Sequence, residues 1–227
     1  MTTETAARYE LRDAAEARFL ARVYRWMTLA LGVSAVTAWY VGSSPELMRG
    51  ILAHPWAFFA ALVAEVVVVV AFTSVSRRAS FPAAAAMFLF YALLSGVTLS
   101  VVVWRFTPSS LGATFAITAG MFATMSLYGT VTGKDLSGWG SFLMMGLVGI
   151  ILAGVVNMFI HSSALDFMLG CAGVVTFTGL TAYHAQALRR GADPSDGGAA
   201  LRGALILYLN FVNLFLSLLR LTGRQRN

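Results

Sequence analysis

Residues 139–160 read WGSFLMMGLVGIILAGVVNMFI and contain no charged side chain. A helix needs about 20 mainly apolar residues to cross the hydrocarbon core of a bilayer. The same bias extends over the whole chain, because 58% of its 227 residues are hydrophobic and only 26 are charged (16 basic plus 10 acidic). A soluble chain carries roughly a quarter charged residues, about 57 at this length. The composition therefore predicts an integral membrane protein and excludes most soluble classes.

Seven stretches are long and apolar enough to span a membrane, which predicts an all-α bundle. Their length argues against a β-barrel, whose strands would be about ten residues of alternating polarity. Residues 1–23 mix arginines with acidic residues, so we expect a helical cytoplasmic extension and no cleaved signal peptide. Residues 24–227 then form a single seven-helix membrane domain. The predicted spans are 24–42, 56–75, 82–104, 109–131, 139–160, 164–187 and 203–221.

Small residues recur at four-residue spacing in two of these spans. One set is Gly112, Ala116 and Gly120, and the other is Gly149 and Ala153. This spacing allows helices to approach one another closely. We therefore expect both sets to form packing faces inside the bundle.

The basic residues are unevenly shared between alternate loops, and this predicts the orientation. With a cytoplasmic N-terminus, 11 of the 16 Lys and Arg lie on the inner side and 5 on the outer side. The positive-inside rule favours that arrangement, and an odd number of spans places the C-terminus outside. The basic tail opposes it, so a re-entrant last segment with both termini inside is the alternative. Because these arginines flank apolar spans, the net charge of +6 does not indicate nucleic acid as a partner.

Polar residues at membrane depth are the candidate functional residues, because a charge there costs about 2.5 to 3.5 kcal/mol. Glu65 lies halfway along the second span. One interpretation is a protonated carboxyl bonded to a Ser, Thr or Asn of another helix, and the other is a cation or proton pathway. On the seventh span, Asn210, Asn213 and Ser217 share one face at spacings of three and four. With His184 of the sixth span they either hold the two helices together or line a gated path.

The sequence predicts no enzyme. Its three histidines are scattered without zinc-site spacing, and it contains no HExxH, phosphate-binding loop, dinucleotide fingerprint or GxSxG motif. The single cysteine, Cys171, excludes an intrachain disulfide. We therefore expect no cofactor and no confident metal site, with Glu65 as the one acidic residue at depth that could contact a cation.

Four ordered motifs stand in the second half of the chain: FAITAGMFATMSLYG at 115–129, DLSGWGSF at 135–142, FTGLTAY at 177–183 and LYLNFVNLF at 207–215. Through them the chain, from Thr114 onward, resembles the transmembrane Bax inhibitor 1 family, also called the Bax-inhibitor-motif family, in its bacterial form. The resemblance implies a seven-helix bundle with the seventh helix central, and a pH-sensitive leak of calcium through the membrane.

The chain departs from the family at the gate that the resemblance implies. That gate is a pair of aspartates, one after Thr-Ala-Tyr of the sixth span and one before Phe-x-Asn of the seventh. Here the two positions hold His184 and Asn210, neither of which can become anionic. The arginine that can pair with the first aspartate in relatives corresponds loosely to Arg77 or Arg78. A remaining pH response would depend on His184, whose reference pKa is about 6.5, and acid would disfavour cation entry.

Two functions follow as hypotheses. The first is a protein of this family, in a bacterial inner membrane, whose calcium leak has altered gating. The second is a non-transporting protein that binds and modulates another membrane protein, such as a quality-control protease, with segment 1–23 as the contact. The bilayer is the one partner that both require, and neither specifies an oligomeric state.

Overall fold

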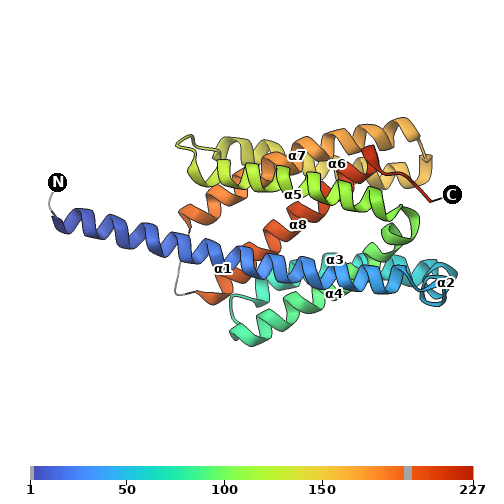
Figure 1. The fold of residues 1–227 in the computed structure, drawn as a ribbon, viewed down its shortest axis with the longest axis horizontal. Helices are drawn as coiled ribbons and strands as arrows, with labels where there is room; N and C mark the ends of the chain where they lie inside the picture. Colours follow the sequence, from blue (N-terminus) through green and yellow to red (C-terminus); the bar gives the residue numbers. More distant parts are fainter. Residues whose placement is uncertain (1–2, 192–195, 227) are drawn as a thin grey trace. The chain divides into compact units, whose positions relative to one another are not determined.

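The computed structural model describes residues 3–191 and 196–226, and within them the regular elements are helices. A single antiparallel bridge pairs Phe106 with Gln225 in that part of the chain. The elements are α1 (Thr3–Gly42), α2 (Pro45–Ala53), α3 (Pro55–Val75), α4 (Phe81–Arg105), α5 (Pro108–Val131), α6 (Ser137–Ile160), α7 (Ser163–Arg190) and α8 (Gly197–Thr222). The all-α prediction is therefore confirmed for the described residues (Figure 1).

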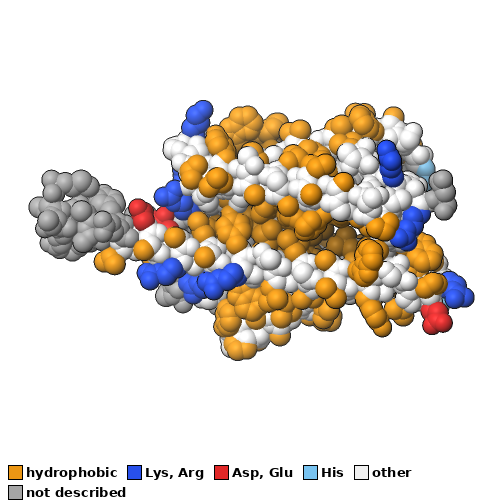
Figure 2. All heavy atoms as spheres, in the orientation of Figure 1, with side chains coloured by type: hydrophobic (Ala, Val, Ile, Leu, Met, Phe, Trp, Pro, Cys, Tyr) orange, Lys and Arg blue, Asp and Glu red, His pale blue; other side chains and the backbone are white. Residues whose placement is uncertain are grey.

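Six of these helices, α3 to α8, are long and apolar enough to cross a membrane. They correspond to the second through seventh predicted spans. The first predicted span, 24–42, is the second half of α1, a 40-residue helix that also contains most of the expected extension. Its place in the membrane, and the central position of the last helix, stay predictions. On the face in Figure 2, hydrophobic side chains cover much of the helices, and Lys and Arg gather in a few small groups.

Proline and hydroxyl residues explain where several helices begin. Pro45, Pro55 and Pro108 occupy the first turns of α2, α3 and α5, where a missing backbone N–H costs nothing. Ser44 and Thr107 precede two of them, and each side chain accepts a hydrogen bond from a backbone N–H of the first turn. The nine-residue α2 was not predicted, because it is too short to register as a span.

The chain folds as two compact units, Met1–Trp104 with Leu188–Tyr208 and Arg105–Ala187 with Leu209–Asn227. In the first unit, a polar contact joins three helices. The Ser34 hydroxyl of α1 lies 2.7 Å from both the Tyr208 hydroxyl of α8 and the Ala92 carbonyl of α4. Phe88 and Tyr91 of α4 pack edge-on against the Tyr208 ring. This fully buried tyrosine therefore sits at the centre of the first unit.

The second unit is packed through glycines that bring backbones together. A Cβ added at Gly129 of α5 would lie 2.1 Å from the Ala182 carbonyl oxygen of α7. At Gly140 of α6 it would lie 2.5 Å from the Tyr183 ring, and at Gly173 of α7 it would lie 2.2 Å from a side-chain oxygen of α8. These positions have no room for a larger residue, so glycine fixes the helix spacing.

The glycines that were predicted to form packing faces are not the ones that contact neighbouring helices. For these glycines the prediction is wrong. A Cβ at Gly112, Gly120 or Gly149 would meet no described atom within 4 Å. The four-residue spacing places small residues on one face of a helix, but it does not determine which face turns toward a neighbour. In this chain, that face of α5 and of α6 turns outward.

Candidate functional site

Glu65 lies at the midpoint of α3, a helix on which Phe72 is the one buried residue. Its Oε1 is 2.5 Å from the Thr98 hydroxyl of α4, which also lies 2.9 Å from the Ser95 carbonyl oxygen. A hydroxyl has one proton and can donate it to only one of these acceptors. A protonated Glu65 would resolve the conflict, because it would donate to Thr98 while Thr98 donates to Ser95. The contact with Thr98 matches the bonded-carboxyl interpretation, and with a proton on Glu65 it would leave no net charge at membrane depth.

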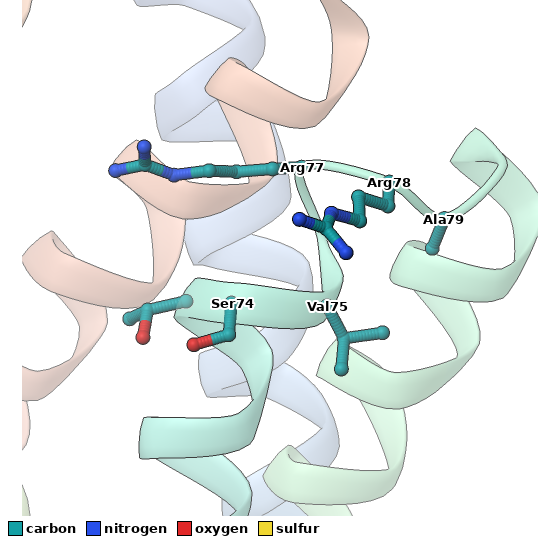
Figure 3. Close-up of a pocket in the computed structure, with 6 residues that line it drawn as sticks. Ser74, Val75, Arg77, Arg78 and Ala79 are labelled. Carbon is teal, nitrogen blue, oxygen red and sulfur yellow. The ribbon is translucent and has the colours of Figure 1, made fainter.

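Arg77 and Arg78 lie in the turn between α3 and α4 (Figure 3). The start of α8 lies at the same end of the first unit. Both side chains are exposed and, within the described chain, neither has an acidic partner. They line an open hollow of about 840 Å³ together with Thr73, Ser74, Val75 and Ala79. His184 belongs to the second unit, and the pairing of either arginine with position 184 stays a prediction.

A third arginine of the first unit is neutralised. Arg202 donates from Nη2 to Asp196 Oδ2 at 2.7 Å and from Nη1 to the Ser76 carbonyl oxygen at 3.4 Å. Asp196 lies just before α8, outside the apolar helices, and also accepts from the Ala199 N–H at 3.0 Å. The hydrogen bond from Arg202 is the main cause that holds the pKa of Asp196 below its usual value.

His184 and Asn210 lie in contact within the second unit. The His184 Nδ1 of α7 is 2.9 Å from the Asn210 Nδ2 of α8, and Asn210 is only 4% exposed. An amide nitrogen can only donate, so in this orientation Nδ1 has no proton and the neutral ring holds its proton on Nε2. The Tyr183 ring packs beside the imidazole with centroids 5.1 Å apart. The structure therefore brings together the two residues that replace the expected aspartates.

Gln186, two residues after His184, is a contact that the sequence reasoning missed. Its side chain is 4% exposed and binds the loop between α5 and α6 with both ends of its amide. Nε2 donates to the Lys134 carbonyl oxygen at 2.7 Å, and Oε1 accepts from the Leu136 N–H at 2.9 Å. The one sequence signal was an uncharged polar residue near the end of an apolar helix. Gln186 fixes this end of α7 and thereby positions His184.

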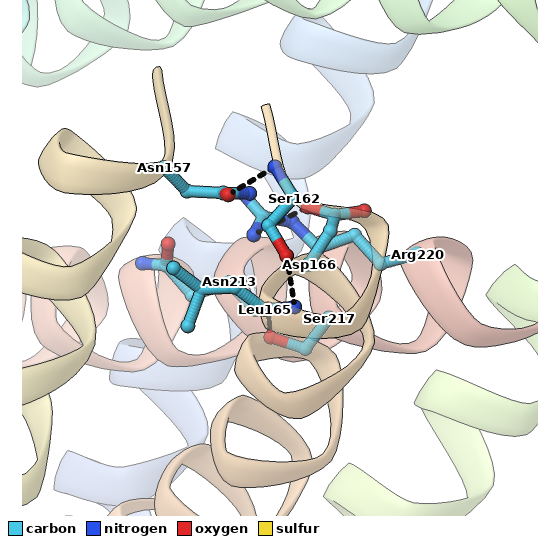
Figure 4. Close-up of polar contacts among 7 residues, drawn as sticks. All are labelled: Asn157, Ser162, Leu165, Asp166, Asn213, Ser217 and Arg220. Atoms are coloured by element: carbon cyan, nitrogen blue, oxygen red, sulfur yellow. Dashed lines mark hydrogen bonds and ion pairs between the residues drawn. The ribbon is translucent and has the colours of Figure 1, made fainter. Parts of the chain in front are cut away.

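Asn213 and Ser217 follow Asn210 on α8, but they bond within their own helix. Asn213 Nδ2 donates to the Leu209 carbonyl oxygen at 2.8 Å, and the Ser217 hydroxyl donates to the Asn213 carbonyl oxygen at 2.7 Å. Figure 4 shows them near the start of α7, where Arg220 contacts Asp166 at 3.3 Å. Of the three polar residues on this face, Asn210 is therefore the one whose side-chain hydrogen bond crosses to α7.

Metal binding has no geometric support in residues 3–191 and 196–226, where no group of three or more His, Cys, Asp or Glu is placed to hold an ion. Cys171 is exposed on α7. The chemistry of the candidate site is thus hydrogen bonding by a neutral imidazole and an amide. Such a pair can change its bonding with pH, because a protonated imidazole has two donors and no acceptor.

The helices define a polytopic α-helical membrane protein. The family model described as "Inhibitor of apoptosis-promoting Bax1" matches residues 16–227, and the chain belongs to this Bax inhibitor family. It is 38% identical over 215 residues to the inner membrane protein YbhL of Escherichia coli strain K12, covering 92% of each chain. An uncharacterized protein of Borreliella burgdorferi is 41% identical over 216 residues, covering 92% of this chain and 93% of its own.

A more distant relative extends the match over almost the whole chain. It is an uncharacterized membrane protein of Streptococcus pyogenes serotype M1, 31% identical over 224 residues, covering 96% of this chain and 97% of its own. The predicted family and the membrane location are therefore confirmed.

Proposed function

We propose that this protein is a calcium-leak protein of the bacterial inner membrane whose gate is altered by the replacement of two aspartates. The observation that carries the proposal is the contact of His184 Nδ1 with Asn210 Nδ2 at 2.9 Å. These are the positions at which the resemblance to the family expects the aspartate pair. A polar latch between α7 and α8 is retained, but its members are neutral in the observed bonding.

The substitution changes how such a latch responds to ions and protons. Two carboxylates attract a divalent cation and titrate as a coupled pair. Asn210 does not titrate, and a protonated His184 repels a cation. Protonation also removes the Nδ1 acceptor, so the observed bond from Asn210 breaks or the amide turns over. We therefore propose that the leak is weaker than that of a two-aspartate protein and that acid reduces it.

The inner-membrane location and the cytoplasmic N-terminus belong to the same proposal. The location is supported by the E. coli relative, which is named an inner membrane protein. The orientation is supported by the 11 to 5 distribution of Lys and Arg between the two sides. Because Cys171 is the only cysteine, a C171S protein gives a clean background for labelling single cysteines from either side.

Calcium flux in liposomes tests the proposed gate. The full chain is reconstituted with a calcium-sensitive dye inside, and flux is measured from pH 5.5 to 8 for wild type and for H184D/N210D. Restoring both carboxylates should raise the flux and make it pH-dependent, because the pair can then bind a cation or share a proton. No rise above wild type would overturn the proposal.

The matched control is N213D, which adds a carboxylate one turn further along α8, where the native amide bonds to its own helix. We expect its flux to stay near the wild-type level. A rise equal to that of H184D/N210D would contradict a specific role for the pair. Absence of flux from every protein would instead favour the non-transporting partner considered from the sequence.

A further inference from the structure

The turn between α3 and α4 concentrates positive charge in a hollow. Arg77 and Arg78 line about 840 Å³ of open space, and no described side chain neutralises either guanidinium. Figure 3 shows Arg77 extending away from the turn, while Arg78 folds back over the end of α3 beside Val75. The volume lies within the range of about 300 to 1,000 Å³ typical of small-molecule sites.

The backbone carbonyls of this turn accept no hydrogen bond from the side chains of Arg77 and Arg78. The Ser76 N–H donates to the Phe72 carbonyl oxygen at 2.9 Å, and the N–H groups of Arg78 and Ala79 both lie 2.9 Å from the Val75 carbonyl oxygen. The Phe72 and Val75 carbonyls at the end of α3 therefore have backbone partners. The two guanidinium groups keep all their donors for an external acceptor, and a phosphate can take two of them at once.

The surroundings of the hollow indicate which anion it accepts. Val75 lines it and is 48% exposed, and Val70, lower on α3, is 62% exposed. Both belong to α3, whose exposed apolar side chains form a wall beside the hollow, and Phe72 is the one buried residue of this helix. A soluble phosphate would leave this wall unused, whereas the acyl chains of a phospholipid would cover it.

We propose that Arg77 and Arg78 bind the phosphate headgroup of an anionic phospholipid at the end of α3. The hydroxyl of Ser74 is a further donor in the same hollow. Basic pockets at the ends of membrane helices are a known form of lipid recognition. This inference goes beyond the proposed leak and does not depend on it, because it concerns only residues of the first unit.

The test compares lipids on the purified full-length protein in a neutral detergent. Native mass spectrometry counts bound lipid, and the melting temperature is followed by tryptophan fluorescence during titration. The probes are phosphatidylglycerol, zwitterionic phosphatidylcholine with the same acyl chains, and inorganic phosphate. Each arginine near an anionic headgroup should contribute about a 5-fold preference, so both should give about 25-fold for phosphatidylglycerol over phosphatidylcholine.

R77Q/R78Q should lose this preference while its melting temperature without lipid stays at the wild-type value, because both side chains are exposed and without partners. R77K/R78K should keep most of it, because the charges remain. R25Q is the matched control: Arg25 is exposed, bonds to the Ala21 carbonyl oxygen at 3.2 Å and lies on the same predicted side of the membrane. R25Q should bind as wild type does.

Three results would overturn the proposal. The first is an unchanged lipid preference in R77Q/R78Q. The second is an equal loss in R25Q, which would indicate a general charge effect. The third is a rise in the wild-type melting temperature with inorganic phosphate that equals the rise with phosphatidylglycerol. This result would identify a soluble anion as the ligand.

Discussion

Glu65 gives the sharpest prediction, because the structure specifies the hydroxyl that contacts its carboxyl group. Its Oε1 lies 2.5 Å from the Thr98 hydroxyl, which also reaches the Ser95 carbonyl oxygen at 2.9 Å. If Glu65 is protonated, a glutamine of the same length can donate its amide N–H to the same hydroxyl. E65Q should therefore change the free energy of unfolding by less than about 0.5 kcal/mol.

The partner substitution should cost more. Thr98 is 8% exposed, and T98V keeps its shape while removing the hydroxyl from the Glu65 carboxyl. An interhelical hydrogen bond in a membrane contributes roughly 0.6 to 1.7 kcal/mol, and a buried group without a partner costs about 1 to 3 kcal/mol. We expect T98V to destabilise the protein by about 1 to 2 kcal/mol.

Reversible unfolding in mixed micelles, followed by tryptophan fluorescence, measures both values. T73V is the control, because the Thr73 hydroxyl donates to the Val70 carbonyl oxygen of its own helix at 2.7 Å and its side chain is exposed. It removes the same hydroxyl without breaking a contact between helices. Its effect should stay within about 0.5 kcal/mol.

Two outcomes would refute the reasoning. An ionised Glu65 at mid-depth costs about 2.5 to 3.5 kcal/mol, so stabilisation by E65Q of more than about 1.5 kcal/mol would exclude the protonated form. A T98V effect no larger than that of T73V would show that the contact contributes nothing. The same E65Q protein also belongs in the flux assay, where an unchanged wild-type flux would remove Glu65 from the ion path.

Two further predictions concern packing and pH. G129A should destabilise the protein by at least about 2 kcal/mol, because the added Cβ would meet the Ala182 carbonyl oxygen at 2.1 Å. G120A, whose Cβ would meet no described atom within 4 Å, should be neutral or stabilising by up to about 1 kcal/mol. Thermal unfolding compares the two variants, and equal effects would contradict the close approach of α5 and α7 at Gly129. The lowered pKa of Asp196, caused mainly by Arg202, means that its stabilisation is complete above the usual carboxyl range and is lost as pH falls through the folded-state pKa. D196N should therefore destabilise at pH 7 by less than about 1 kcal/mol and have a smaller effect as the pH falls below the usual carboxyl range, and a difference that grows in acid would contradict the pairing.

Helix positions were predictable because they depend on local composition. The predicted span 56–75 became Pro55–Val75, and 109–131 became Pro108–Val131. In each case a proline marks the start, and a run of apolar residues sets the length. The last helix begins at Gly197, six residues before the predicted 203, because Asp196 accepts a hydrogen bond from the Ala199 N–H of its first turn. A polar cap extends a helix beyond its apolar run.

The partners of the polar residues could not be read in the same way. The sequence placed Asn210, Asn213 and Ser217 on one face, but it could not show that Asn210 reaches His184 while the other two bond along α8. Gln186 escaped notice because its two partners lie more than 45 residues away in the chain. These choices depend on the rotation of one helix against another.

The sequence alone determined the membrane class, the family and six of the spans, because low charge and long apolar stretches permit only helices that satisfy their own backbone in lipid. It also determined which two residues stand at the positions of the expected aspartates. Only the tertiary structure decided that these residues touch, that Thr98 supports Glu65, and that Gly129 rather than Gly120 faces a neighbouring helix. The physical reason is that contacts between helices are fixed by close packing of surfaces, and this packing depends on every helix at once.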